Sequence, residues 1–268
     1  MKYRKRAWLL LLVAVLLFVV CGWNYRLKIL TYSVETQKLT SPVRVACIAD
    51  LHCCRWGEDQ RKLLDEIDAA APDLVVLVGD ILDDTMPLAQ GYTVLEHLAA
   101  NWPCYYVTGN HDAQLSETIA AFGIIVLDGQ RQEISVRDQP LQICGISDPR
   151  THGTPWFSAQ LTTLNGKNAA YEGFSMLLAH RPSYIDSYLP GDYDLILSGH
   201  AHGGQWRIPG LLNGLLAPDE GLFPKYAGGL YQMEDTTFIV SRGLAKESTR
   251  VPRLYNPPEL VLIDLLPE

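Results

Sequence analysis

The residues best suited to chemistry stand directly after apolar runs of the sequence. Five such groups carry carboxylate, amide or imidazole side chains: Asp50-Leu51-His52, Gly79-Asp80-Ile81-Leu82-Asp83, Gly109-Asn110-His111-Asp112, His180 and Gly199-His200-Ala201-His202. Imidazole and carboxylate ligands together favour Mn, Fe, Zn or Co over Ca or Mg. About seven such ligands are too many for one tetrahedral structural zinc site and suit two ions that share a carboxylate. Two ions held about 4 Å apart can activate a water and hold phosphate oxygens during in-line attack.

The apolar runs before these groups predict buried strands, and the segments between several of them predict helices. The expected strands are Val43–Ala49, Asp73–Val78, Cys104–Thr108, Phe174–Ala179 and Asp194–Ser198, and the expected helices are Glu58–Ala71, Pro87–Ala100 and Asp112–Phe122. Strands that alternate with helices indicate βαβ units and a parallel sheet. Ligands of such sheets bind beyond the carboxyl ends of the strands, so we expect the five groups to meet there.

The middle and the end of the chain predict hairpins instead. The expected hairpin strands are Gln132–Val136 with Leu141–Ile146 and Leu230–Met233 with Thr236–Ser241, and a final strand is expected over Leu260–Leu265. This mixture predicts two sheets packed together with helices outside, in one domain over residues 43–268.

The N-terminal segment 1–28 predicts a membrane anchor, followed by a linker over 29–42. Ala7–Trp23 is an unbroken apolar run of 17 residues, which as a helix spans roughly 25 Å, enough for a thin hydrocarbon core. Four basic residues precede the run, so we expect a single-pass cell-membrane protein with a cytoplasmic N-terminus and an extracytoplasmic body. A cleaved signal peptide is the main alternative, although Val19-Val20-Cys21-Gly22 offers a poor cleavage site.

The charge of the remaining chain argues against nucleic acid as a partner. All 30 acidic residues but only 16 of the 22 basic residues follow residue 28, so residues 29–268 carry a formal net charge of −14. Sequence-independent binding of nucleic acid depends on a basic surface, whereas acidic clusters can hold divalent cations. The five cysteines of this part are odd in number and scattered, which does not indicate a disulfide framework.

The motifs D-x-H, G-D-x-x-D, G-N-H-D, H and G-H-x-H, in this order, resemble those of the calcineurin-like metallophosphoesterase superfamily. They span about 150 residues and are all present. The resemblance implies an α/β fold, a four-layer α/β/β/α sandwich with two mixed sheets, here with an N-terminal transmembrane helix added. Residues 199–205 and the tail 241–259 resemble the bacterial, membrane-associated phosphodiesterase branch.

The resemblance also implies a role for each motif residue. The implied metal ligands are Asp50, His52 and His202 for one ion, Asn110, His180 and His200 for a second, and Asp80 as the bridge between the two. The two divalent ions would be Mn²⁺, Zn²⁺ or Fe, and a hydroxide bound to them would attack phosphorus in line. His111 would stabilise the transition state and protonate the leaving oxygen, and Asp83 would orient His111.

Departures from the family pattern narrow the class of substrate. Protein Ser/Thr phosphatases of the superfamily carry Arg after the second Asp of G-D-x-x-D, where this chain has Asp84. Losing that phosphate-binding cation argues against a protein phosphatase. The candidates for contact with substrate phosphate or anionic lipid headgroups are Arg181 and Arg242, the latter in a basic loop with Lys246, Arg250 and Arg253.

The sequence therefore predicts a metal-dependent hydrolase of a phosphodiester or phosphomonoester, acting on a lipid-linked or other envelope-associated substrate. A pyrophosphatase acting on a nucleotide-linked lipid precursor is a close alternative, although that chemistry usually needs a cytoplasm-facing site. A non-catalytic module that recognises phosphate through bound metal is a second alternative. Such a module would be expected to lack His111 or some ligands, and none is missing.

Overall fold

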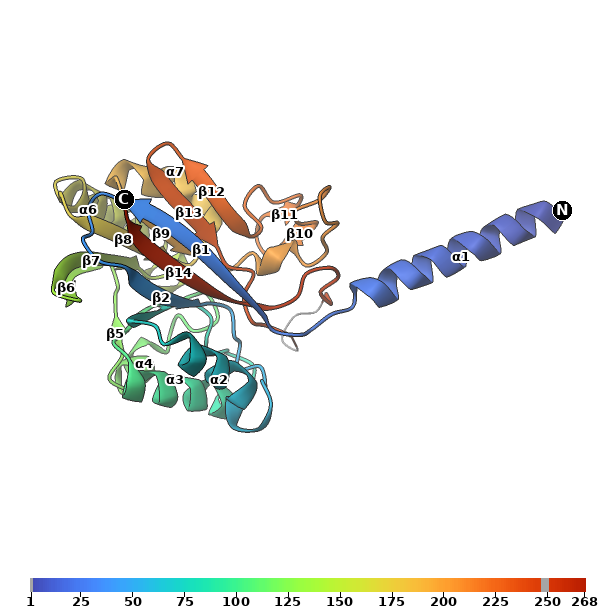
Figure 1. Ribbon diagram of the computed structural model, residues 1–268, viewed down its shortest axis with the longest axis horizontal. Coiled ribbons are helices and arrows are strands. Elements are labelled where there is room, and N and C mark those ends of the chain that lie inside the picture. Colours follow the sequence, from blue (N-terminus) through green and yellow to red (C-terminus); the bar gives the residue numbers. More distant parts are fainter. Residues whose placement is uncertain (1, 247–250) are drawn as a thin grey trace.

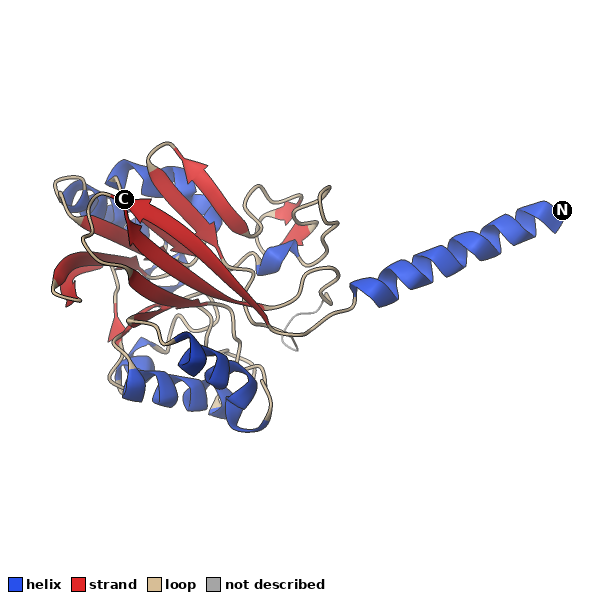
Figure 2. Cartoon of the chain, in the orientation of Figure 1, coloured by secondary structure: helices blue, strands red, loops and turns tan. Residues whose placement is uncertain are grey.

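Two six-stranded sheets form the body of the protein in a computed structural model that describes residues 2–246 and 251–268 (Figures 1 and 2). The first sheet contains, in spatial order, β1 (Lys28–Thr36), β14 (Glu259–Pro267), β2 (Val43–Ile48), β3 (Leu74–Val78), β4 (Cys104–Val107) and β5 (Ile125–Val126). Strands β2 to β5 are parallel, and β14 runs antiparallel to β2. The carboxyl ends of β2, β3 and β4 therefore share one edge, as the motif positions require.

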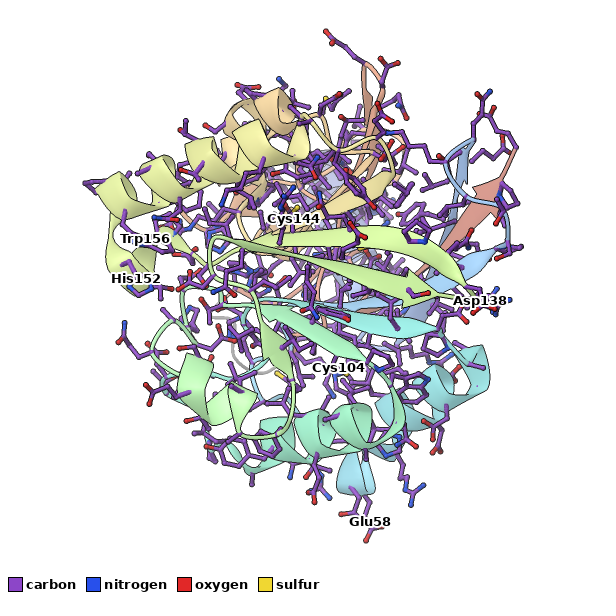
Figure 3. All side chains as sticks on the ribbon, turned by 90° about the vertical axis from the view of Figure 1, so that its left-hand side faces the viewer. Glu58, Cys104, Asp138, Cys144, His152 and Trp156 are labelled. Carbon is purple, nitrogen blue, oxygen red and sulfur yellow. The ribbon has the colours of Figure 1, made fainter. Side chains whose placement is uncertain are left out.

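The second sheet is also mixed. Its strands, in spatial order, are β12 (Gly229–Met233), β13 (Thr236–Val240), β9 (Leu195–Ser198), β8 (Phe174–Ala179), β7 (Gln139–Ile146) and β6 (Gln130–Val136). Antiparallel hairpins form both edges, and the strands between them are parallel. Both predicted hairpins are confirmed, and Asp138 marks the turn of β6–β7 (Figure 3).

The core is layered because alternate residues of a strand face opposite sides. Val45 and Cys47 of β2 join the core between the two sheets, together with Met176 of β8. Ala46 and Ile48 instead pack with the helices on the outer face of the first sheet. Those helices are α2 (Arg61–Ala70), α3 (Ala89–Asn101) and α4 (Ser116–Ala120); α6 (Thr154–Asn168) and α7 (Ile185–Tyr188) cover the second sheet. The predicted four-layer α/β/β/α sandwich is confirmed.

The predicted linker over 29–42 is wrong for its first part. Residues 28–36 form strand β1, which pairs in parallel with β14 at the other end of the chain. Only Val34 and Thr36 of this strand are buried. Because so few of its residues face the core, its sequence lacks the long apolar run that marks a buried strand. The strand is specified by a partner more than 200 residues away, and no local pattern reveals such pairing.

Two helices also differ from the sequence prediction. The helix expected over Asp112–Phe122 is shortened to α4, because the Asp112 side chain turns inward and accepts hydrogen bonds from the backbone N–H groups of Gly109 and Ile81. Helix α6 was not predicted. It follows the short helix α5 (Pro149–His152), and Trp156 in its first turn packs on the His152 ring (Figure 3).

Helix α1 (Lys2–Gly22) projects from the body (Figure 1). Its segment Tyr3–Gly22 has a mean hydropathy of 2.2 and is long and apolar enough to cross a membrane. The last turn is attached to the body by Tyr255, whose N–H donates to the Gly22 carbonyl at 2.7 Å and whose hydroxyl donates to the Phe18 carbonyl at 2.9 Å. Residues 1 and 247–250, which fall in the predicted anchor and domain, lie outside the described residues.

Candidate metal centre

The five motifs converge where the carboxyl ends of β2, β3 and β4 meet those of β8 and β9. His180 Nε2 lies 3.1 Å from Asp80 Oδ2, which links the second sheet to the first. His202 Nε2 lies 3.8 Å from Asp50 Oδ1, which is a second contact between the two sheets. All four of these side chains are buried. The convergence expected from strand order is therefore confirmed.

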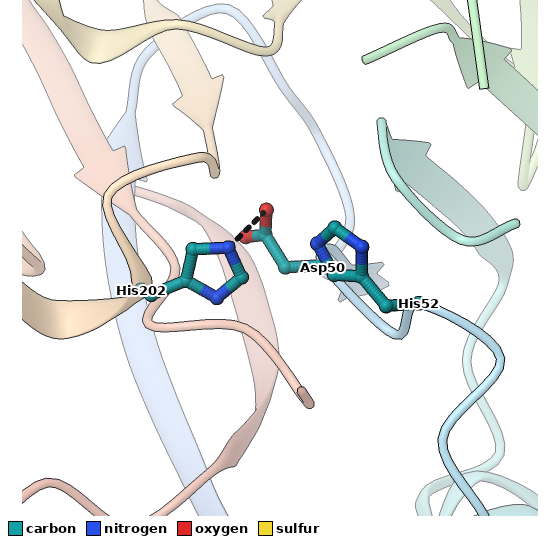
Figure 4. A group of neighbouring side chains, drawn as sticks. All are labelled: Asp50, His52 and His202. Carbon is teal, nitrogen blue, oxygen red and sulfur yellow. Dashed lines mark ion pairs between the residues drawn. The ribbon is translucent and has the colours of Figure 1, made fainter. Parts of the chain in front are cut away.

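The ligand atoms form two groups. Those of Asp50, His52 and His202 lie within 4.8 Å of one another, and Figure 4 shows Asp50 between the two histidines. Those of Asp80, His180 and His200 form the second group at the same spacing. Asp80 Oδ2 lies 3.7 Å from His52 Nε2, so this carboxylate stands between the groups.

Unpartnered buried atoms show that the donor set fits divalent cations. His52 Nε2, Asn110 Oδ1 and His200 Nε2 are buried and have no hydrogen-bond partner among the described residues. Leaving such atoms without a partner costs free energy, and cations bound at the two groups would remove that cost. Imidazole nitrogens with carboxylate and amide oxygens suit Mn, Zn or Fe.

The pKa values of the cluster reflect its burial and its close charges. Burial raises the pKa of Asp50 to about 6. Burial lowers the pKa of His180, but the adjacent Asp80 carboxylate outweighs this and raises it to about 10. Burial and the neighbouring His180 charge lower the pKa of His200 to about 3. The nearby carboxylates thus favour the charged form of His180, whereas an imidazole that binds a metal ion must be neutral.

Hydrogen bonds outside the cluster orient its imidazole rings. His180 Nδ1 lies 2.8 Å from the Val78 carbonyl, and His52 Nδ1 lies 2.7 Å from Asp83 Oδ2. Each contact engages one ring nitrogen and leaves Nε2 for the centre. The backbone N–H of His200 donates to Asp50 at 3.0 Å. A β-carbon at Gly109 would overlap the Asp80 carboxylate, so glycine is required for this close approach.

The prediction that Asp83 orients His111 is wrong. Asp83 is buried and turned toward His52, and its other oxygen accepts hydrogen bonds from the Thr85 and Met86 N–H groups. His111 Nδ1 contacts Asp84 Oδ1 instead, at 2.8 Å. The turn after β3 directs the two neighbouring carboxylates to different histidines. The position that carries Arg in protein phosphatases thus holds the partner of His111.

Both candidate phosphate-binding arginines are paired with carboxylates. Arg181 lies 2.5 Å from Asp148 and 2.6 Å from Asp219, and Arg242 lies 3.2 Å from Glu259. Arg253 of the same basic loop is fully buried and donates to backbone carbonyls, so it has a structural role. Arg250 lies outside the described residues.

Sequence reasoning missed Asp219. Its Oδ2 lies 3.5 Å from His200 Nε2, at the turn between the short strands β10 (Leu216–Ala217) and β11 (Gly221–Leu222). The turn sequence Pro218-Asp219-Glu220-Gly221 gives no sign that this carboxylate reaches the centre. The two remaining histidines lie elsewhere: His97 contacts Asp68, and His152 contacts Asp128.

A cavity of about 430 Å³ opens beside the centre. Its lining residues are His52, Asp83, Thr85, His111, His202, Gln205, Leu216, Ala217, Pro218 and Val251. Two candidate ligands, His52 and His202, and His111 thus line the same cavity as the apolar residues Leu216, Ala217, Pro218 and Val251. Neither Arg181 nor Arg242 is among the described residues that line this cavity.

The model of the calcineurin-like phosphoesterase family matches residues 43–204, more than half of the chain. The chain belongs to this family. It is 28% identical to the metallophosphoesterase YkoQ of Bacillus subtilis over 94% of this chain and 97% of YkoQ. It is also 28% identical to the phosphodiesterase YaeI of Escherichia coli over 84% of this chain and 83% of YaeI. The crystal structure of TT1561 of Thermus thermophilus shares the fold, with a TM-score of 0.52 and 11% identity over 77% of this chain and 92% of TT1561.

Family membership confirms the enzyme class predicted from the motifs. The protein is a metal-dependent phosphoesterase, a hydrolase whose family uses a dinuclear metal centre. Each of the two groups of ligand atoms described above could hold a metal ion.

Proposed function

We propose that this phosphoesterase hydrolyses a phosphodiester at the surface of a membrane to which helix α1 anchors it. The observation that carries the proposal is the cavity beside the ligand cluster, which is lined both by His111 with two candidate ligands and by four apolar residues. A phosphate group fits the polar side, and an apolar substituent fits the wall of Leu216, Pro218 and Val251. Similarity to the phosphodiesterase YaeI supports a diester over a monoester.

Seven side chains would hold two divalent ions in the same sets that the motifs imply. The proposed ligands are Asp50, His52 and His202 for one ion, Asn110, His180 and His200 for the other, and Asp80 for both. When bound, the ions would activate a water and neutralise charge on phosphate oxygens. Arg181 and Arg242 are proposed as weaker, longer-range contributors to phosphate affinity, because each is already paired with a carboxylate.

His111 is proposed as the general acid. One of its ring atoms lies within 4.8 Å of ligand atoms of His52 and Asp80, and the residue lines the cavity. The hydrogen bond from Nδ1 to the Asp84 carboxylate fixes the orientation of the ring. The other nitrogen, Nε2, is then directed to the substrate, and when the ring carries a proton on both nitrogens it can deliver the Nε2 proton to the leaving oxygen.

We infer that α1 is retained as an anchor and crosses the cell membrane once, with its N-terminus in the cytoplasm and the catalytic body outside. The basic residues before the apolar run support this direction. The two hydrogen bonds from Tyr255 to the last turn of α1 support retention, because a cleaved peptide would lose them.

The test is metal-restored hydrolysis by the full chain in nanodiscs. After chelation, Mn²⁺, Zn²⁺, Mg²⁺ or Fe²⁺ would be added singly with bis-p-nitrophenyl phosphate, p-nitrophenyl phosphate or a nucleotide diphosphate-linked lipid. The proposal expects diester cleavage that returns with metal and is absent in Asp80→Asn. A preference for the pyrophosphate bond would favour the pyrophosphatase instead. No cleavage of any compound by a folded protein with two bound ions would favour a phosphate-recognition module.

A further inference from the structure

Exposed apolar side chains concentrate in one segment of the body. Among the described residues after Trp23, seven large hydrophobic side chains are exposed, and five of them belong to residues 206–223. We call these five residues the apolar tip: Trp206, Ile208, Leu211, Leu222 and Phe223. Leu211 is 81% exposed, Leu222 65% and Phe223 64%. Such a concentration of exposed apolar surface indicates a binding partner.

The apolar tip lies on the side of the body from which α1 projects. Figures 1 and 2 show the β10–β11 segment at the end of the body nearest to α1. Contacts between residues support this placement. Trp206 forms an isolated β-bridge with Leu254, and its indole N–H donates to the Pro252 carbonyl at 3.0 Å. The next residue, Tyr255, binds Gly22 at the end of α1. Residues 252–255 therefore contact both Trp206 of the apolar tip and Gly22 at the end of α1.

The same segment reaches the metal centre. Leu216, Ala217 and Pro218, which lie between the two halves of the apolar tip, line the cavity beside His52 and His111. Asp219 follows them and lies 3.5 Å from His200 Nε2. Residues 206–223 thus carry the exposed apolar side chains of the apolar tip, and residues 216–218 between them line the catalytic cavity.

Charged and aromatic residues near the end of α1 favour a bilayer as the occupant of this side. Trp23, Tyr25, Arg26, Lys62 and Lys246 line a second cavity, of about 480 Å³, where α1 enters the body. Aromatic rings of this kind prefer the membrane interface. Cations at that level attract anionic headgroups, although the body as a whole is acidic.

We propose that the apolar tip inserts into the interface of the membrane that α1 spans, so that the catalytic cavity opens at the bilayer surface and accepts phosphodiesters carried by lipids. This inference rests on the proposed function for its chemistry, but the membrane contact itself does not depend on catalysis. Anchoring by α1 alone would leave the cavity free to face the aqueous phase. Two separate contacts, the helix and the tip, would fix its orientation toward the bilayer.

The first test measures the contact directly. A polarity-sensitive fluorescent amino acid would replace Leu222 in the full chain, in nanodiscs of phosphatidylethanolamine and phosphatidylglycerol with or without brominated acyl chains. Leu230 is the matched control, because it is exposed but lies in the β12–β13 hairpin. We expect bromolipid quenching at 222 and none at 230. Equal quenching at both positions, or burial of the 222 probe that depends on a second copy of the chain and not on lipid, would overturn the inference.

The second test measures the consequence for substrate choice. The variant L211S/L222S/F223S removes apolar side chains that do not line the catalytic cavity, and L230S serves as its control. We expect a roughly tenfold loss of kcat/KM for a phosphatidyl p-nitrophenyl ester in nanodiscs, with unchanged turnover of soluble bis-p-nitrophenyl phosphate. Unchanged turnover of both compounds would contradict the role of the tip. If the chain labelled at 222 shows bromolipid quenching but the parent chain cleaves neither compound, the proposed function fails while the membrane contact stands.

Discussion

The Nδ1 atom of His111 lies 2.8 Å from Oδ1 of Asp84. The preceding carboxylate, Asp83, is engaged by His52 at 2.7 Å. Two adjacent acids therefore support two different histidines, one of them a proposed metal ligand and the other the proposed general acid. The Asp83 pair is buried, whereas the Asp84 pair is partly exposed to solvent, so the two pairs are expected to differ in strength.

Substituting these two acids should separate metal affinity from turnover. Asp83→Asn is expected to weaken metal binding by roughly 10–100-fold, because it removes the group that orients a ligand imidazole. Asp84→Asn is expected to leave the metal content unchanged and to lower kcat by roughly tenfold through misorientation of His111. Metal titration and steady-state kinetics on both variants measure the two effects. Loss of metal in Asp84→Asn with full occupancy in Asp83→Asn would reverse the assignment.

Removing the proposed general acid should spare the metal centre. His111→Ala is expected to retain both ions and to lose roughly 10²–10⁴-fold in turnover of substrates with poor leaving groups. The loss should be smaller for p-nitrophenolate, which needs little protonation. Metal analysis and kinetics with two leaving groups provide the measurement. Turnover at the parent level with both ions bound would exclude His111 from the mechanism.

Removing metal should reduce both activity and thermal stability. Binding to the folded state alone stabilises a protein by about 2.7 kcal/mol at a hundredfold excess over Kd. We therefore expect the chelated protein to unfold several degrees lower and to recover its Tm on re-addition of the activating ion. Asp80→Asn should show little recovery, because Asp80 stands between both ligand groups. A Tm that is insensitive to metal in the parent protein would argue against cation binding at this cluster.

Asn256 should stabilise the loop that carries His202. Its buried side-chain amide donates to the carbonyls of His202 and Gln205 at 2.7 and 3.2 Å. Each carbonyl also accepts a backbone hydrogen bond, from Gln205 N–H and Leu254 N–H respectively, so Asn256→Ala removes two additional bonds. We expect a loss of about 1–3 kcal/mol in the free energy of unfolding for these two bonds, together with weaker metal binding.

Asn101→Ala is the control for that substitution, because the Asn101 side chain is exposed and makes a single local hydrogen bond. Its effect should stay within about 0.5 kcal/mol. Thermal unfolding of the parent and both variants, with and without metal, supplies the comparison. Equal losses in the two variants would show that Asn256 has no special role.

The sequence by itself determined where most of the strands lie along the chain and which residues are the candidate ligands. Each ligand type follows an apolar run directly, as Asp50 follows β2 and His180 follows β8. Both the run and the residue after it are local features. Parallel strands place their carboxyl ends at a common edge, so the meeting of distant motifs could be predicted without coordinates. The four-layer fold followed from the resemblance that the same motifs carry.

Only the tertiary structure decided which side chains contact one another. Asp83 contacts His52 and Asp84 contacts His111 because of the conformation of the turn after β3. The two acids are adjacent in the sequence, so their positions alone do not show which histidine each one contacts. Strand β1 required its partner β14, and Asp219 reached His200 only through the folding of a loop. These contacts depend on the three-dimensional positions of groups far apart in the chain, whereas hydrophobic periodicity and motif spacing report only on neighbours.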